Sequence, residues 1–256
     1  MRALRLLGVG WVFHFKMISR SAFDGVGQVI YPLFFATVAF FVFRAGDSPR
    51  TLLYASLGAA VMGMWSATST TAGAAMQRER WTGTLEVLVG TPPHFALILL
   101  PITIAMATIG IYSLAATLLW GWLLFGINLT IVHPLLFVAS VPVTVLSFGS
   151  LGFLFAVCFV RFRAAWALGN MFEYPVWLVC GFLVPLALFP DWVRPISWAL
   201  APTWGMKAIR ESALGGSPFG DLGMCFALGA AYVLLGIFAT ERVLRAARER
   251  AALSLT

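Results

Sequence analysis

The stretch MQRERWTGTLEVLVGTPP, residues 76–93, decides how the chain is organised, because it is a polar, charged island between two long apolar runs. Charged residues 78–80 end the run before it, since a charge near the centre of a bilayer costs about 2.5–3.5 kcal/mol on insertion scales. Gly90 is a natural helix stop, and Pro92 suits the first turn of a following helix. Residues 84–89 are therefore predicted to form a short helix, which would be unstable alone in water and needs a partner surface.

The composition is that of a polytopic membrane protein. Of 256 residues, 61% are hydrophobic and 11% are charged, whereas ordinary soluble domains carry about 25% charged residues. The net charge of +7 does not by itself indicate nucleic-acid binding, because Lys and Arg also accumulate in cytoplasmic loops. The cysteines, Cys158, Cys180 and Cys225, lie far apart inside apolar runs, so we expect small core residues and neither a disulfide nor a metal site.

The apolar runs predict an all-α polytopic membrane protein with six transmembrane helices. A helix needs about 20 residues to cross a bilayer, and the predicted spans are residues 27–43, 52–76, 95–125, 134–160, 164–189 and 222–240. They form one membrane domain over residues 25–256. The segment 190–221 is too polar for a span and too apolar for a solvated loop, so we expect two broken, outward-facing helices there, before the last span.

Residues 1–24 carry charges too often for a span and are predicted to form an amphipathic interfacial helix. At about 100° per residue, one side carries the apolar stripe of Leu4, Leu7, Trp11, Phe15, Ile18 and Ala22, and the opposite side carries Arg2, Arg5, Lys16 and Arg20. The basic side would face anionic lipid of the inner leaflet. The alternative is a frayed beginning of the first span.

Basic residues predict the orientation. Six spans leave both termini on one side, and twelve of the seventeen Lys and Arg residues then fall on that side. Since cytoplasmic loops are enriched in Lys and Arg, both termini and the 76–93 segment are expected in the cytoplasm.

The 76–93 segment resembles the cytoplasmic coupling segment of type-2 ABC transporter permeases. The match is carried by Glu79, Gly83, Thr84, Leu85, Glu86, Leu88, Thr91 and Pro92. A second match, to the late segment of the same family, is carried by Gly181, Pro185, Phe189, Pro190, Trp192, Ile196, Trp198, Pro202 and Arg210. Within the family, the chain resembles the drug and lipid exporters of the daunorubicin-resistance kind.

The resemblance implies a bacterial inner-membrane permease that exports a hydrophobic or amphiphilic compound, such as a drug, lipid or polyketide. Two copies of a separate ATPase subunit would bind ATP and Mg, and a second permease, identical or homologous, would complete the transporter. The residues that carry the first match, together with Arg80, would contact the ATPase. Besides these subunits, the expected partners are membrane lipids and no nucleic acid.

The chain itself is not expected to be an enzyme or to bind a cofactor or metal. A Walker A loop needs Gly-Lys followed by Ser or Thr, but Lys16 and Lys207, the only lysines, follow Phe15 and Met206. We identify no catalytic residues.

Polar residues inside two predicted spans are candidates for the translocation path or gate. Asn170 and Glu173 lie in the fifth span, and an ionisable residue within a membrane indicates function by default. Ser66 and Thr70 lie in a small-residue stretch of the second span, which suits either a gate or ordinary close helix packing. The alternative for Glu173 is a structural pair with Arg161, Arg163 or Asn170.

Two other classes of function remain open. An intramembrane lipid-modifying enzyme would need convergent polar residues at one depth, and only Asn170 and Glu173 qualify. A gradient-driven secondary transporter would be expected to show internal repeats and several intramembrane charges, and the sequence shows neither.

Overall fold

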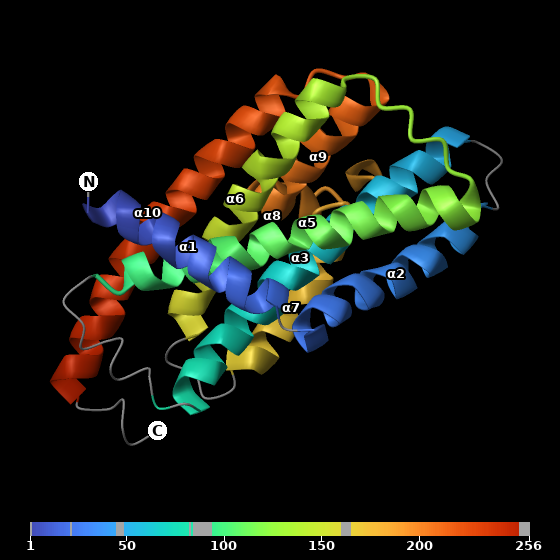
Figure 1. The fold of residues 1–256 in the computed structure, drawn as a ribbon. Coiled ribbons are helices and arrows are strands. Elements are labelled where there is room, and N and C mark those ends of the chain that lie inside the picture. The colour runs from blue at the N-terminus through green and yellow to red at the C-terminus, as the bar shows by residue number, and fades with distance from the viewer. Residues whose placement is uncertain are drawn as a thin grey trace.

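The computed structural model describes residues 2–20, 22–44, 49–81, 83, 94–159 and 165–250, with side chains for most of them. Within these residues the chain is helical, without strands, which confirms the predicted all-α class. In order, the elements are α1 (Arg2–Arg20), α2 (Ala22–Arg44), α3 (Pro49–Trp81), α5 (Ala96–Phe125), α6 (Pro134–Phe159), α7 (Ala165–Val179), the 3-10 turn η1 (Leu186–Leu188), α8 (Val193–Trp198), α9 (Ala201–Leu214) and α10 (Phe219–Arg250) (Figure 1).

Among the described residues, three helices are long and apolar enough to cross a membrane by length and composition. They are Ala96–Phe125, Pro134–Cys158 and Phe219–Arg242. A shorter apolar helical stretch, Pro32–Phe43, lies in α2. The complete set of six spans stays a prediction.

Helix α3 is longer than predicted. The charged residues 78–80 were expected to end the second span near Met76, yet the helix continues to Trp81. Charge excludes these residues from the centre of a bilayer, but Gln, Arg and Glu are good helix formers, so the backbone stays helical. Gly83 follows with φ 68°.

Helix α7 is shorter than the predicted fifth span, residues 164–189. The helix ends at Val179. Gly181 has φ 70°, which glycine adopts without strain. Pro185, which lacks an N–H, then precedes η1 with an extended ψ of 136°.

Helix α1 ends at Arg20 and packs on α5 through part of its predicted apolar stripe. Ile18 is buried in a cluster with residues of α5 and α6. The Trp11 Nε1 donates a hydrogen bond to the Thr108 Oγ1 at 3.1 Å, and the Phe15 ring contacts the Tyr112 ring. The stripe therefore meets protein along most of its described length, because α5 offers a long apolar surface. Among the stripe residues whose side chains are described, only Leu4 stays largely exposed.

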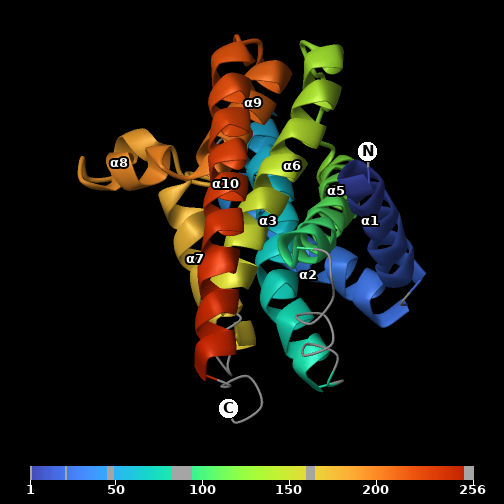
Figure 2. The same cartoon turned by 90° about the vertical axis from the view of Figure 1, so that its left-hand side faces the viewer.

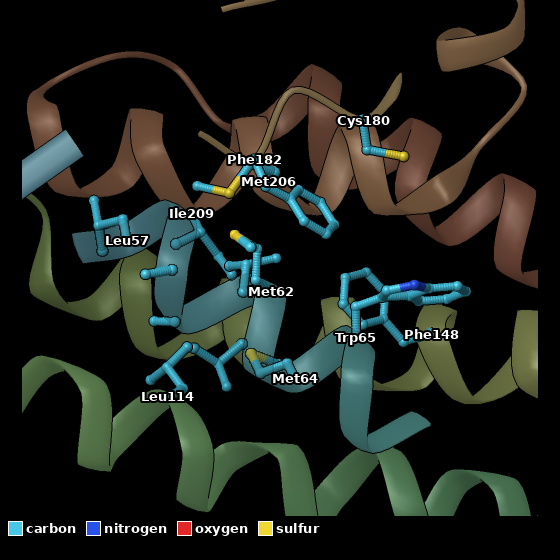
Figure 3. Packing of buried hydrophobic residues seen from close by; sticks show 14 of the residues in the cluster. Leu57, Met62, Met64, Trp65, Leu114, Phe148, Cys180, Phe182, Met206 and Ile209 are labelled. Carbon is cyan, nitrogen blue, oxygen red and sulfur yellow. The ribbon is translucent and has the colours of Figure 1, made fainter. Parts of the chain in front are cut away.

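The core is built around α3, which packs against α2, α5, α6, α7 and α9. Trp65 on α3 is fully buried and meets the Phe148 ring of α6 edge-on at 5.7 Å. Figure 3 shows this pair, and Met206 and Phe182 of the same cluster lie near Met62, one turn earlier on α3. Because α3 contacts so many partners, a movement of α3 would be felt throughout the bundle.

The two ends of the bundle carry different segments. The C-terminal ends of α3 and α10 lie at one end, and α9 lies toward the other (Figure 2). At this second end, the linker before α6 bonds to the end of α9, since the Val132 and His133 amides donate to the Ala213 and Ser212 carbonyls. The 76–93 segment therefore begins at the end remote from α9.

Candidate functional site

Two of the predicted path residues meet in the core. The Ser66 Oγ on α3 donates a hydrogen bond to the Glu173 Oε1 on α7 at 2.5 Å. The exposed fractions of the two residues are 7% and 2%. A buried carboxyl group is costly unless it is hydrogen-bonded, so the Ser66 hydroxyl is the partner that makes this position tolerable.

The other two predicted path residues lie near this pair in sequence. Asn170 is half-buried and precedes Glu173 by three residues, so both lie on one face of α7. Thr70 follows Ser66 by four residues on α3, and its side chain lies outside the described part of the structure. The hypothetical partners Arg161 and Arg163 also lie outside the described residues. Ser66 is a partner for Glu173 that neither of the sequence hypotheses named.

Aromatic contacts join the three helices next to the pair. Trp65 and Phe172, which precede Ser66 and Glu173 in the sequence, both contact the Phe155 ring of α6, at centroid distances of 6.1 and 5.3 Å. The Trp65 Nε1 is buried without a hydrogen-bond partner among the described residues. The pair that joins α3 to α7 thus has neighbours in the sequence that pack on α6.

The predicted coupling segment is only partly described. Glu79 and Arg80 belong to the last turn of α3, although their side chains are not described. Gly83 is exposed, with open space where a Cβ would lie. Thr84, Leu85, Glu86, Leu88, Thr91 and Pro92 lie outside the described residues, so the predicted short helix at 84–89 and its contacts stay a prediction.

Residues 190–221 contain two short helices, as expected, namely α8 and α9. They differ in burial. Trp192, just before α8, is 68% exposed, and Trp198, the last residue of α8, is 53% exposed. In contrast, α9 buries nine residues and packs on α6 and α10. In Figure 2, α8 projects sideways from the bundle while α9 lies within it.

A tyrosine that the sequence analysis did not single out joins α10 to the beginning of α9. The Tyr232 hydroxyl donates to the Ala199 carbonyl at 2.6 Å and accepts from the Ala201 amide at 3.1 Å. One signal could have found it: Tyr232 is the only tyrosine in an otherwise aliphatic and small-residue stretch of the last span.

Arg210 on α9, which the family resemblance included, makes contacts with two other parts of the chain. Its Nη1 donates to the Gly181 carbonyl at 2.8 Å and its Nη2 donates to the Phe182 carbonyl. Its guanidinium carbon lies 3.5 Å from the centroid of the Tyr54 ring on α3. These contacts could not be predicted from sequence spacing because they join three separate elements.

The carboxyl group of Glu211, the residue after Arg210, has a raised pKa. Partial burial is the main cause that raises the pKa of its carboxyl group, and the nearby negative charge of Asp221 raises it further. Lys207 opposes the shift. Glu211 therefore holds a proton at higher pH than a free carboxyl group would.

Comparison with known proteins supplies the identity. A direct comparison with curated proteins finds no match. Residues 6–214 match the family described as ABC-2 type transporter, and this range runs from within α1 to the last residue of α9. Members of the family are membrane permeases that work with an ABC ATPase, which agrees with the long apolar helices described above. The chain belongs to the ABC-2 type transporter family.

Proposed function

We propose that this permease exports a hydrophobic or amphiphilic compound and receives the work of ATP hydrolysis through residues 76–93. The observation that carries the proposal is the continuity of α3. From Ser66 to Trp81 the helix is unbroken, and at 1.5 Å per residue it spans about 22 Å. A displacement at the charged end would therefore reach the buried Ser66–Glu173 pair as movement of one rigid element.

The proposed topology has six spans, formed by α2, α3, α5, α6, α7 and α10, with both termini in the cytoplasm. Two observations support it. The C-terminal ends of α3 and α10 lie at the same end of the bundle (Figure 2), and with six spans twelve of the seventeen Lys and Arg residues of the sequence would fall on that side. The exposed basic residues of α1, Arg5, Lys16 and Arg20, would then lie against the inner leaflet of a bacterial membrane.

The proposed transporter contains two permeases, identical or homologous, and two ATPase subunits that bind ATP and Mg. The short helix at 84–89, with Glu79, Arg80 and Glu86 as polar contacts, would sit in a groove of the ATPase. Closure of the ATPase dimer on ATP would push this helix, and α3 would carry the movement to the contacts with α2, α5 and α7.

Alanine substitution of Leu85 and Glu86 together tests the contact. We expect less ATPase to co-purify with the full chain, because the helix would lose its apolar and its charged contact. Arg194→Ala is the matched control: it removes an exposed charge at α8, far from the 76–93 segment, where Arg194 pairs only with exposed Asp191 at 3.1 Å among the described residues. Unchanged association and transport in the double variant would reject the contact.

The Ser66–Glu173 pair favours a cargo with a cationic or polar group on an apolar body. Glu173→Gln removes the charge while its Oε1 can still accept the Ser66 hydrogen bond. We expect ATP-driven export of cationic amphiphiles to fall and export of neutral ones to persist. Equal loss for both kinds of cargo, or no loss for either, would contradict the cargo assignment.

A further inference from the structure

The turn after α7 contains two buried carbonyl groups whose donor comes from another part of the chain. The helix ends at Val179, and Cys180 and Phe182 in the following turn are 2% and 0% exposed. The last carbonyls of a helix lack partners within it, and here the Gly181 and Phe182 amides donate to the Leu178 and Trp177 carbonyls. The Gly181 and Phe182 carbonyls themselves receive hydrogen bonds from outside the turn.

Arg210 supplies both of these hydrogen bonds from α9. Its two terminal nitrogens reach two successive carbonyls, Gly181 O and Phe182 O, which uses the planar fork of the guanidinium group. The face of the same group lies on the Tyr54 ring, 3.5 Å from its centroid. One side chain thus holds α9, the turn after α7 and α3 together.

Gly58 on α3 completes the arrangement. A Cβ at Gly58 would lie 1.9 Å from the Phe182 carbonyl oxygen and 2.9 Å from the Arg210 Nη2. Only glycine lets α3 approach this carbonyl so closely. Gly58 and Tyr54 are four residues apart, so they present one face of α3 to the turn and to Arg210.

We propose that Arg210 is a latch that ties α9 to the turn after α7 and, through Tyr54, ties both to α3, and that transport requires this latch to open. Among the described residues no carboxylate forms an ion pair with Arg210; its two hydrogen bonds to carbonyl groups lie within residues 181–214, and its link to α3 is the Tyr54 side chain. A shift of α3 would therefore separate Tyr54 from the guanidinium group and release residues 181–214 from α3, and this second part rests on the proposed function of α3 as the moving element.

Cys180 reports the state of the latch, because it is buried inside the turn that Arg210 holds. In the background C158S/C225A, the only thiol of the chain is Cys180. The rate at which a small thiol reagent modifies it is measured for the full chain in liposomes without an ATPase. In R210K we expect the rate to rise at least about tenfold, because a lysine cannot donate to both carbonyls and stack on the ring, and one hydrogen bond to a charged group is worth at least this factor.

A conservative pair of variants at Tyr54 provides a second test that leaves Arg210 in place. Y54F keeps the ring but loses the hydroxyl that hydrogen-bonds to Arg210, so its Cys180 should label more slowly than that of Y54L. Y54L removes the ring as well and should label several-fold faster than the unsubstituted background. Arg194→Lys, on the exposed α8, is the control and should change nothing. Equal Cys180 rates in the background, R210K and Y54L overturn the latch. If R210K does not fold, the difference between the Cys180 labelling rates of Y54F and Y54L decides whether the latch exists.

Release during transport is tested with the ATPase subunit bound. Faster modification of Cys180 in the C158S/C225A background while ATP is hydrolysed supports release, and R210K should then hydrolyse ATP with less transport per ATP. A Cys180 rate that does not change during active transport overturns release. Failure of an ATPase to associate at all would instead overturn the proposed function. The Cys180 labelling rates in liposomes without an ATPase would still show whether Arg210 holds the turn.

Discussion

Replacement of Gly63 by alanine probes the packing on which this fold depends. Gly63 lies on α3 where it meets both α2 and α5. A Cβ at this position would lie 1.8 Å from the Ser113 Oγ and 2.8 Å from the Pro32 Cβ. Ordinary van der Waals contact begins at 3.4 Å, so the first contact falls short of it by about 1.6 Å. Rotation of the serine could relieve part of the overlap, but the proline ring is rigid.

The expected loss follows from the size of this overlap. Overpacking a close-packed core by one methyl group typically costs about 1–3 kcal/mol, so Gly63→Ala should lower the free energy of unfolding by about 2 kcal/mol. Ser113→Ala should be nearly neutral alone, because its Oγ is buried without a hydrogen-bond partner among the described residues. The double variant removes the shortest contact and should recover about 1 kcal/mol of the loss, which is a measurable coupling between neighbours.

The assay is the free energy of unfolding of the purified full chain in mixed micelles, measured for the two single variants and the double variant. Gly8→Ala is the matched control, because a Cβ at Gly8 in α1 meets nothing within 4 Å, and alanine is the better helix former by about 0.5–1 kcal/mol. The packing of α2, α3 and α5 described here is refuted if Gly63→Ala is as stable as the unsubstituted protein, or if the losses of the two single variants simply add.

Three further outcomes follow from other contacts. Tyr232→Phe should lower the free energy of unfolding by about 1–3 kcal/mol, because the two backbone groups at the beginning of α9 lose a buried partner; unchanged thermal stability would contradict this role. Burial, and then the charge of Asp221, raise the pKa of Glu211 above its ordinary 4.5. The folded state therefore favours the protonated carboxyl group of Glu211. The stability that this proton contributes is fully present below pH 4.5 and is lost as pH rises through the raised folded-state pKa. Glu211→Gln should therefore raise the melting temperature near neutral pH and flatten its change on acidification, and an unchanged pH profile would contradict the assignment. Cys158 is exposed while Cys180 and Cys225 are buried, so mass spectrometry after brief treatment with a membrane-permeant thiol reagent should find label on Cys158 first.

Hydropathy and charge predicted much of the fold because they indicate which stretches of the chain are stable in a membrane and which need water. The apolar runs around residues 95–125 and 134–160 became α5 and α6 with nearly the expected bounds. The ends of α3 and α7 were predicted less well. At α3, the charged residues 78–80 mark where an apolar run stops, but their helix propensity carries the backbone on to Trp81.

The bounds of the fifth span differ from those of α7 for the opposite reason. The run from residue 164 to residue 189 is apolar enough for a span, but α7 ends before a turn that the glycine at 181 and the proline at 185 set, and hydropathy alone does not detect this turn. The cysteine prediction was also only partly correct, because Cys180 and Cys225 are buried in the core but Cys158 is exposed.

The candidate site shows the limit of a single sequence more clearly. Ser66, Asn170 and Glu173 could be selected because polar residues are rare in apolar runs, but the hydrogen bond between Ser66 and Glu173 joins residues 107 apart. Which helices become neighbours is decided by packing over the whole bundle, and the spacing of one sequence does not contain it. The same holds for Arg210, whose partners lie on α3 and in the turn after α7.

Site-specific crosslinking at Glu86→Cys tests the central claim most directly. If residues 76–93 receive the work of ATP hydrolysis, this cysteine should react only with reagent that reaches the cytoplasmic side, and it should crosslink to the ATPase subunit with a yield that changes during ATP hydrolysis. Modification from the outer side by a membrane-impermeant reagent, or active ATP-driven transport with no crosslink to the ATPase, would contradict the account.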